Sequence, residues 1–499
     1  MNVFVTGATG FIGRALVLRL LGGGHTVSAW VRSVEHARSR LGVETELIPM
    51  AGGDAVLEAA VSRADAIVNL AGEPIVAGRW TLARKRALVE SRVALTSRLV
   101  AAIQRATVRP RVLVSGSAIG LYGDRGSETL DEASREGGDF LASLCSRWES
   151  AALDAQALGV RVALIRTGIV LGPEGGALQK MLPLFRAGGG GRLGSGRQFM
   201  SWIHLRDLVE MFATAVTDSR WHGAFNGVTP SPVDNRTFTS ALGRALRRPA
   251  FLPAPAPALR VLLGEASQVL LGSQRVLPLR ALALGFRFRF DTLDGALRAI
   301  VSSDATSIER LSPTSPVPVA ASAYLARRRP THLLRHVTRI AAPLEETFAF
   351  FSRAGNLGLL TPPAMGFQIT ASPSSMREGA VIDYAIRLGP VPLSWRTVIE
   401  KWDPGRVFVD SQARGPYRCW WHEHHFRRDG EATLMEDRVY FAAPFGPIGR
   451  LANRLFIQSQ LRRIFAYRAE AIALRFETRG PRFVRNDAAS VAENSQPAA

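Results

Sequence analysis

The opening segment, residues 1–33, constrains the fold more than any other part of the chain. An apolar run with strand character ends at a turn that carries Gly7, Gly10 and Gly13. A helix-like stretch and a second apolar run follow, and the second run ends at Arg32. This order is typical of the strand–turn–helix–strand unit that holds a dinucleotide pyrophosphate. An ordinary βαβ turn is the alternative, but each glycine stands where the tight turn, the phosphate approach and the helix packing need it.

The turn and the first helical residues supply the predicted cofactor contacts. A helix N-terminus presents free N–H groups and the positive end of the helix dipole, and both favour a phosphate there. The residues that we predict to contact the nucleotide are Gly7, Thr9, Gly10, Phe11, Ile12 and Gly13.

Arg32 bears on the identity of the nucleotide. About 20 residues after the glycines, Asp or Glu suits the ribose 2′-OH of NAD, whereas Arg accommodates the 2′-phosphate of NADP. The chain has Arg32, followed by Ser33, at that place. We therefore predict NADP(H) as the cofactor, the alternative being a solvated arginine in an arginine-rich protein.

Length and composition set the outer bounds. A chain of 499 residues with 47% hydrophobic residues should form two or three globular domains. It has no long uncharged run of the kind that spans a membrane, and it enters a strand at once, so we expect no signal peptide and a cytoplasmic protein. Cys145 and Cys419 give neither a disulfide framework nor a metal-binding spacing.

The net charge of +20 raises the question of nucleic acid or an anionic membrane. Nearly all of the basic residues are arginines, and they are spread along the chain. Nucleic-acid readers concentrate positive charge on one face or place it among stacking aromatics. Neither pattern is present, so we predict no nucleic-acid partner.

Strand-like and helix-like segments alternate through the first part of the chain. Strands are expected at residues 66–70, 112–115 and 160–166, and helices at 82–105 and 141–158. Such alternation predicts a Rossmann-type, doubly wound parallel sheet, in which ligands bind outside the carboxyl ends of the strands. A smaller substrate lobe is expected mainly within residues 175–300.

Several motifs carry a family resemblance, in order along residues 1–302. They are TGATGFIG, NLAGEPI, SGSAIGLYG, LCSRWE, RTGIVL, GSGRQFMSWIHLRDL and FNGVTPSPV. This region resembles the extended short-chain dehydrogenase/reductases, and more closely their atypical epimerase-family branch. The resemblance implies that Arg32, Leu70, Ala71, Arg92 and Val170 line the cofactor site. Arg92 could be a second cation for the 2′-phosphate or a surface arginine of a helix.

The chain departs from the parent superfamily in its proton relay. Ordinary members use a Tyr whose phenol is acidified by a Lys four residues later on the same helix face. None of the three lysines of this chain has a tyrosine four residues before it. The helix that should carry the pair has Phe140 or Leu141 near the Tyr position and Leu144 or Cys145 near the Lys position.

Other side chains could replace the missing pair. Ser117 matches the serine that normally assists the tyrosine, and Tyr122 follows on the same loop, so these two are the catalytic candidates. Tyr122 could equally be a packing residue, because an unassisted phenol has a pKa of about 10. Cys145 is expected to be a buried thiol rather than a nucleophile, and Glu149 to pair with an arginine such as Arg166 or to act as acid or base. His204 is expected to position the substrate pocket.

After residue 302 the composition changes. Residues 303–330, rich in Pro, Ser and Ala around 312–322, predict a linker, and residues 478–499 a disordered tail. Between them a strand at 332–340, a short helix at 343–351, alternating segments and a helix at 448–476 predict an antiparallel sheet that grips a long helix.

Residues 331–477 resemble the START-like, polyketide-cyclase-like helix-grip domains. The motifs are APLEETFAFF, NLGLLTPP, GPYRCWWHEHHF and MEDRVYF. The resemblance implies a cavity for an apolar ligand, with Trp395, Trp420 and Tyr440 as candidate liners. His422 and His424 share one strand face, but the sequence places no third ligand beside them, so we predict no metal.

Two classes of function are compatible with these patterns. The chain could be an NADP(H)-dependent oxidoreductase or epimerase with an altered proton relay, acting on a small molecule that the second domain binds or delivers. It could instead sense NADP(H) and an apolar ligand without turnover. The sequence determines neither the substrate nor the oligomeric state.

Overall fold

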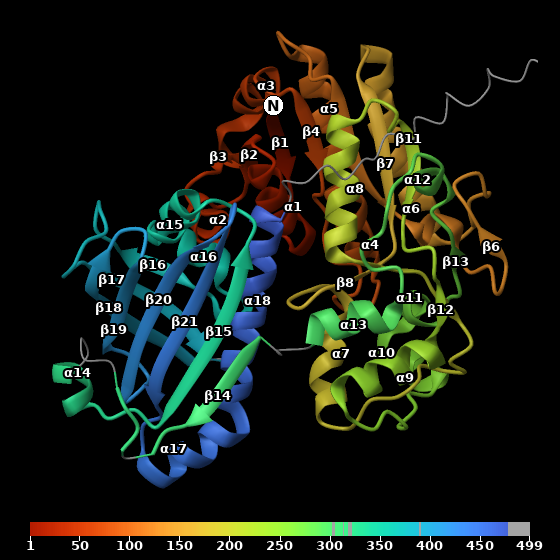
Figure 1. The fold of residues 1–499 in the computed structure, drawn as a ribbon. Helices are drawn as coiled ribbons and strands as arrows, with labels where there is room; N and C mark the ends of the chain where they lie inside the picture. Colours follow the sequence, from red (N-terminus) through yellow and green to blue (C-terminus); the bar gives the residue numbers. More distant parts are fainter. Residues whose placement is uncertain (302–304, 313, 318–321, 389–390, 478–499) are drawn as a thin grey trace, which may run out of the picture.

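The computed structural model describes residues 1–301, 305–312, 314–317, 322–388 and 391–477. Two sheets dominate these residues, one parallel and one antiparallel, and a small helical lobe lies below the parallel sheet in Figure 1. The predicted tail, residues 478–499, lies outside the described residues. Among the described helices, none combines the length and the apolar character that a membrane span requires.

The first sheet has the order β3-β2-β1-β4-β5-β7-β11, and every neighbouring pair is parallel. Its strands are β1 (Asn2–Thr6), β2 (Thr26–Val31), β3 (Glu46–Pro49), β4 (Ala66–Asn69), β5 (Val112–Ala118), β7 (Arg161–Thr167) and β11 (Gly223–Gly227). The predicted Rossmann-type, doubly wound sheet is therefore confirmed.

Helices cover both faces of this sheet because its strands are apolar on both sides. Val3 and Val5 face α1 (Phe11–Gly22), α2 (Val34–Leu41) and α8 (Leu205–Thr217). Phe4 faces the other layer, which contains α3 (Gly53–Ser62), α5 (Leu95–Arg105) and α6 (Phe140–Leu153). The helix predicted at 82–105 consists of α4 (Leu82–Val89), a π-helical turn (Glu90–Ala94) and α5.

The lobe has its own apolar core, to which Leu178, Phe238 and Leu297 belong. Its main helices are α7 (Gly176–Arg186), α9 (Asn235–Leu246), α10 (Ala256–Leu263) and α13 (Leu293–Val301). The range predicted for the lobe, 175–300, also contains α8 and β11, which belong to the parallel sheet and its cover.

The second sheet is antiparallel, with the order β14-β15-β21-β20-β19-β18-β17-β16. Its strands are β14 (Thr306–Arg310), β15 (His332–Ile340), β16 (Gln368–Ala371), β17 (Val381–Leu388), β18 (Val391–Asp403), β19 (Val407–Arg414), β20 (Cys419–Asp429) and β21 (Ala432–Ala442). A long helix, α18 (Gln458–Phe476), packs on one face of this sheet, where Leu461 and Phe465 contact Val439 and Phe441.

The predicted linker differs from the structure. Residues 306–310 form β14, which pairs antiparallel with β15 and extends the second sheet. Residues 322–327 form a short helix, α14 (Ser322–Arg327). The proline-rich composition around 312–322 suggested an extended connection, but a strand of five residues gains its stability from a partner farther along the chain.

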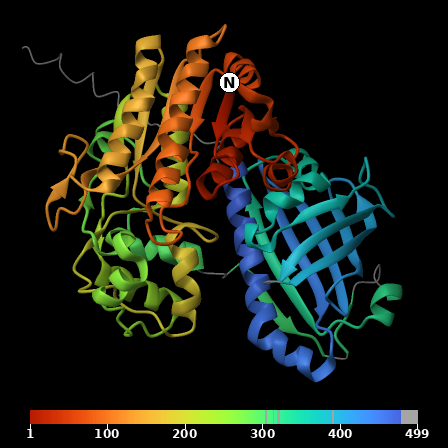
Figure 2. The ribbon, with the colours of Figure 1, turned by 180° about the vertical axis from the view of Figure 1, so that it is seen from behind.

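The two parts of the molecule share an apolar core. Helix α18 lies between the second sheet and the helices of the first, in both views (Figures 1 and 2). One buried cluster joins Leu16 and Leu20 of α1 to Ile472 and Phe476 of α18. The backbones also approach closely, since a Cβ placed on Gly358 would lie 1.9 Å from the carbonyl oxygen of Ser39. This contact fixes the second sheet beside the nucleotide-binding turn.

Candidate functional site

The glycine turn after β1 has the geometry of a phosphate cradle. Gly7 has a φ of +68°, and a Cβ placed on Gly13 would lie 2.2 Å from the carbonyl oxygen of Gly7. Helix α1 begins at Phe11 with Gly10 at its N-cap, so no side chain caps the first turn. Its N–H groups are therefore available to an anion.

The structure brings other predicted cofactor residues to this turn. A Cβ on Gly7 would lie 2.6 Å from the carbonyl carbon of Leu70, so Leu70 and Ala71 abut the turn. Val170 lies in β8 (Ile169–Leu171), and the segment after that strand packs on the ring of Phe11. These residues fit a nucleotide that lies across the carboxyl ends of the strands.

The two predicted cations, Arg32 and Arg92, both approach Glu73. The Arg32 side chain is 86% exposed, and its Nη1 lies 3.8 Å from the Glu73 carboxylate. Arg92, on the π-helical turn, donates from Nη2 to the Glu73 carbonyl oxygen at 2.9 Å and lies over the Trp148 ring. Burial lowers the pKa of Arg92. The exposed Arg32 side chain can therefore move toward a ligand, whereas its contacts with Glu73 and Trp148 hold the Arg92 side chain in place.

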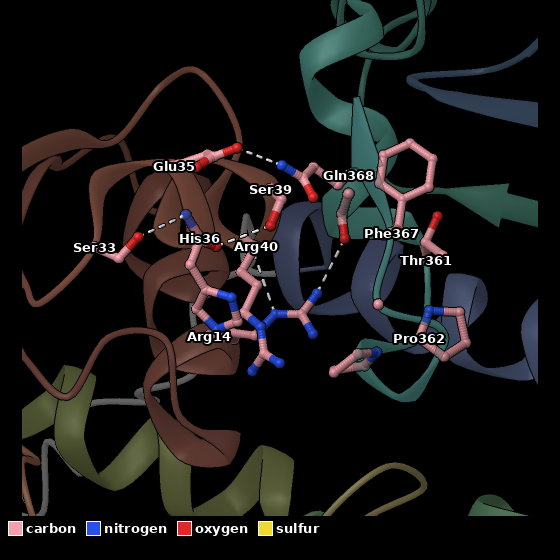
Figure 3. A pocket seen from close by; sticks show the side chains of 13 residues that line it. Arg14, Ser33, Glu35, His36, Ser39, Arg40, Thr361, Pro362, Phe367 and Gln368 are labelled. Atoms are coloured by element: carbon pink, nitrogen blue, oxygen red, sulfur yellow. Dashed lines mark hydrogen bonds between the residues drawn. The ribbon is translucent and has the colours of Figure 1, made fainter. Parts of the chain in front are cut away.

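Beside the turn, a pocket of about 240 Å³ lies between the two parts of the molecule (Figure 3). The first part contributes Arg14 of α1 and residues of the α2 region, and the second contributes residues 358–368. The lining residues that matter here are Arg14, Ser33, His36, Arg40, Gly358 and Gln368. Sequence reasoning missed this pocket, because its two walls are more than 300 positions apart in the chain.

Two arginines stand together in this pocket. Arg14 is 4% exposed and donates to the carbonyl oxygens of Arg40, at 3.2 Å, and Gly358, at 3.1 Å. Its Nη1 atom is buried and has no hydrogen-bond partner among the described residues. The Arg40 guanidinium reaches the glycine turn, where Nη1 donates to the Thr9 carbonyl oxygen at 3.3 Å. Burial, and then the charge of Arg14, lower the pKa of Arg40. This positive site next to the turn suits a phosphate.

Ser117, at the end of β5, belongs to a buried polar network. Its Oγ donates to Glu149 Oε1 at 2.6 Å, and Glu149 forms a bidentate ion pair with Arg166, at 2.8 and 2.9 Å. Ser117 and Glu149 are 4% and 7% exposed. The predicted pairing of Glu149 with Arg166 is therefore present, and the contact with Ser117 adds a proton acceptor behind the serine.

Tyr122 belongs to the same network but is fully buried. Its hydroxyl donates to Asn226 Oδ1 at 2.7 Å and accepts from Arg166 Nη1 at 3.0 Å. Burial raises the pKa of Tyr122, although Arg166 opposes the shift. The tyrosine therefore has the contacts of a packing residue, which was the alternative to its catalytic role.

Helix α6 places Leu141 and Cys145 against Gly120, near the expected positions of the missing tyrosine and lysine. Burial raises the pKa of the Cys145 thiol to about 12, so it stays protonated at neutral pH. A second pocket, of about 430 Å³, is lined by Glu149 and Arg166 and by Ser146 and Ser150 of α6. It connects the buried Glu149 carboxylate to the surface.

His204 is the N-cap residue of α8. Its Nδ1 accepts from the backbone N–H of Arg206 at 3.1 Å, and its ring stacks on Phe290 with centroids 3.9 Å apart. Burial lowers the pKa of His204 to about 4, so the ring is neutral at pH 7. These contacts are those of a positioning residue.

Comparison with known proteins shows the family of the chain. Residues 3–226 match the NAD dependent epimerase/dehydratase family, and residues 254–300 match a domain of unknown function, DUF1731. An Arabidopsis thaliana protein, the chloroplastic SDR39U1 homolog of the epimerase family, is 44% identical over 303 residues, which cover 60% of this chain and 87% of that protein. The chain belongs to this epimerase family.

Other members of the family are similar to a comparable share of the chain. The epimerase family protein MT2273 of Mycobacterium tuberculosis is 42% identical over 59% of this chain and 96% of its own length. The crystal structure of the human family member SDR39U1 (isoform 2) was solved with NADPH. It is 36% identical, covers 60% of this chain and 99% of the human chain, and superposes with a TM-score of 0.55. The family matches extend to residue 300, so the second sheet lies beyond them.

The aromatic candidates of the second sheet lie on different faces. Trp395 and Trp420 contact each other with ring centroids 5.3 Å apart, and Trp420 lies on the face that packs on α18. Tyr440 instead belongs to the opposite face, with Trp421 and Leu325 of α14. Including Tyr440 among the liners of one cavity was wrong, because neighbouring residues of a strand point to opposite faces.

The expectation that no third ligand lies beside His422 and His424 was also wrong. Asp410, on the neighbouring strand β19, places a carboxylate oxygen within 4.8 Å of a ring nitrogen of each histidine. The aspartate precedes the histidines in a separate segment of the sequence. Only the pairing register of β19 with β20 brings Asp410 opposite His422.

Proposed function

We propose that the chain binds NADP(H) across the glycine turn, with the 2′-phosphate of the adenosine held beside the pocket between the two parts. The observation that carries this proposal is the buried Arg14 guanidinium, whose Nη1 has no partner among the described residues, next to Arg40. Arg40 would be the direct cation, because it already reaches Thr9 of the turn. Arg32, at the end of β2, would close over the phosphate from the solvent side.

The NADPH in the human SDR39U1 structure supports this proposal. So does the fit of the turn, where any side chain at Gly13 would occupy the space of the backbone. The second part of the molecule would contribute indirectly, through the Gly358 carbonyl oxygen that holds Arg14.

Titration of the full chain with NADPH and NADH tests the nucleotide preference. We expect the unaltered protein to prefer NADPH, and Arg40→Met to weaken NADPH about 10- to 100-fold, the loss of one charge-assisted hydrogen bond. Binding of NADH should change little. Arg38→Met is the matched control, because Arg38 lies on the same helix but donates to the carbonyl oxygens of Gly42 and Thr45.

Arg32→Asp should likewise weaken NADPH more than NADH. Equal affinities of the unaltered protein for NADPH and NADH would contradict the proposal. An equal effect of Arg38→Met and Arg40→Met on NADPH affinity would show that the pocket does not hold the 2′-phosphate.

We further propose that the protein is an oxidoreductase in which Ser117 and Glu149 replace the usual Tyr and Lys. When bound, NADP(H) supplies or accepts a hydride. In the oxidative direction, the substrate hydroxyl gives its proton to Ser117 Oγ as Ser117 gives its own to Glu149. Glu149 then releases the proton to solvent through the pocket beside it. Arg166 holds the carboxylate in place through two hydrogen bonds.

The relay is tested with stereospecifically deuterated NADPH and a metabolite extract. We expect deuterium transfer by the unaltered protein and a loss of about 100-fold or more in Ser117→Ala and Glu149→Gln. NADPH affinity should be unchanged in both variants, which separates a lost relay from a lost fold. Transfer that persists at full rate in both variants would overturn the role of these residues.

A second function is favoured by the contact between Gly358 and Arg14. We propose, as the alternative, that nucleotide binding is sensed by the second part without turnover. In that case residues 331–477 would be a START-like domain that binds an apolar ligand between the sheet and α18, near Trp395 and Trp420. Mass spectrometry of lipids that copurify with the full chain tests this ligand, and a protein without bound lipid or other apolar molecule would contradict it.

A further inference from the structure

Three neighbouring strands of the second sheet bring four polar side chains together. Asp410 of β19 lies opposite His422 of β20, and His424 of β20 lies opposite Asp437 of β21. The side chains share the face that packs on α18, since the His422 ring contacts Phe465 of that helix. Asp437 is 1% exposed, and the two histidines are 7% and 5% exposed.

Both imidazole rings are held from one side by Asp437. Its Oδ1 atom lies 3.0 Å from His422 Nε2 and 2.8 Å from His424 Nδ1. The contact of His422 is a hydrogen bond to the carboxylate. Nδ1 of His424 also lies 3.3 Å from Nη2 of Arg468, a group that can only donate. Arg468 of α18, at 3.4 Å, neutralises the same oxygen.

The other nitrogen of each ring faces Asp410. Asp410 Oδ2 lies 3.0 Å from His424 Nε2 and 3.6 Å from His422 Nδ1. With a metal on His422 Nδ1 and His424 Nε2, the remaining nitrogen of each ring would carry its proton and face Asp437. One ligand atom from each of Asp410, His422 and His424 lies within 4.8 Å of the other two, which is the spacing of a metal site.

We propose that Asp410, His422 and His424 bind a divalent first-row transition-metal ion such as Zn²⁺, with Asp437 orienting both histidines. In a tetrahedral zinc site with bonds of about 2.0 Å, neighbouring ligand atoms lie about 3.3 Å apart. The two distances from Asp410 lie on either side of this value. A carboxylate that accepts from the second nitrogen of a ligating histidine is the usual outer partner in such sites.

The donor set indicates the chemistry of the site. Two imidazole nitrogens and one carboxylate oxygen suit Zn²⁺ or Fe²⁺ better than Mg²⁺ or Ca²⁺, which prefer oxygen ligands. Three protein ligands leave at least one position for water or another molecule. The Asp410 side chain is 15% exposed, the largest exposure among the three ligands. The site is separate from the nucleotide turn and does not depend on the proposed function.

Metal binding is tested on the full chain after treatment with a chelator. Titration with ZnCl₂ should give one tight site per chain, and Co²⁺ should give visible absorption bands of a tetrahedral or five-coordinate site. Asp410→Asn, His422→Gln and His424→Gln should each weaken Zn²⁺ at least tenfold. Asp437→Asn should weaken it about 10- to 100-fold, as is typical of an outer partner.

His425→Gln is the matched control. His425 lies on the same strand, points to the opposite face and contacts Glu423, so this variant should bind Zn²⁺ as the unaltered protein does. If the variants of the buried residues do not fold, the Co²⁺ spectrum of the unaltered protein decides. An unaltered protein without a stoichiometric Zn²⁺ site or Co²⁺ bands overturns the proposal, and the cluster is then a hydrogen-bonded network only. Variants of Asp410, His422 and His424 that fold and bind as tightly as His425→Gln also overturn it.

Discussion

The ion pair between Arg206 of α8 and Glu470 of α18 joins the two parts of the molecule. The guanidinium lies 2.6 Å from the carboxylate, and the two side chains are 17% and 15% exposed. Arg206 also lies 3.1 Å from Glu477. Removing one partner of a buried pair costs about 3–5 kcal/mol, because the other charge stays buried without a partner. Since these side chains keep some contact with water, we expect Arg206→Met to cost about 3 kcal/mol, the lower end of that range.

Replacement of both partners should cost much less. Arg206→Met combined with Glu470→Met leaves no buried charge, so we expect a loss of about 1 kcal/mol or less. Arg353→Met is the matched control. Arg353 forms an ion pair with Glu44 across the same interface, at 3.2 Å, but its side chain is 56% exposed. An exposed pair of this kind contributes about 0.2–1 kcal/mol.

Amide hydrogen exchange along α18 measures the cost. Each variant should lower the opening free energy of the slowest amides of α18 by the amounts given above. A cost of Arg206→Met no larger than that of Arg353→Met, or a double variant as unstable as the single one, would contradict this expectation. Either result would show that burial does not determine the strength of this contact.

Two other predictions concern His204 and Gly13. The pKa of His204 is about 4 in the folded protein against about 6.5 when unfolded, so its neutral form stabilises the fold above pH 6.5 and this stability is lost as the pH falls toward 4. His204→Asn keeps a helix cap without a titrating ring. The free energy of unfolding of the unaltered protein, minus that of His204→Asn, should fall by about 2.5 kcal/mol between pH 7 and pH 4.5 in urea titrations. A difference that does not change with pH would contradict the lowered pKa of His204. Gly13→Ala should abolish NADPH binding in the same titration as above, because its Cβ would lie 2.2 Å from the Gly7 carbonyl oxygen; unchanged affinity would refute the cradle.

Much of the fold follows from local patterns in the sequence. The strand at 332–340 has the predicted bounds, and residues 82–105 are helical throughout. These elements are predictable because periodicity, turn residues and helix caps act between near neighbours in the chain. β14 was missed because pairing with β15, and not its own composition, makes it a strand.

The sequence alone determined the nucleotide turn, because its three glycines act within one local unit whose backbone must form that way. Only the tertiary structure decided what surrounds the turn. Gly358 reaches Arg14 from a segment far along the chain, and strand register brings Asp410 to His422 and His424. The physical reason is the same in both places. A contact between distant segments depends on how whole elements pack and pair, and no short stretch of residues specifies that arrangement.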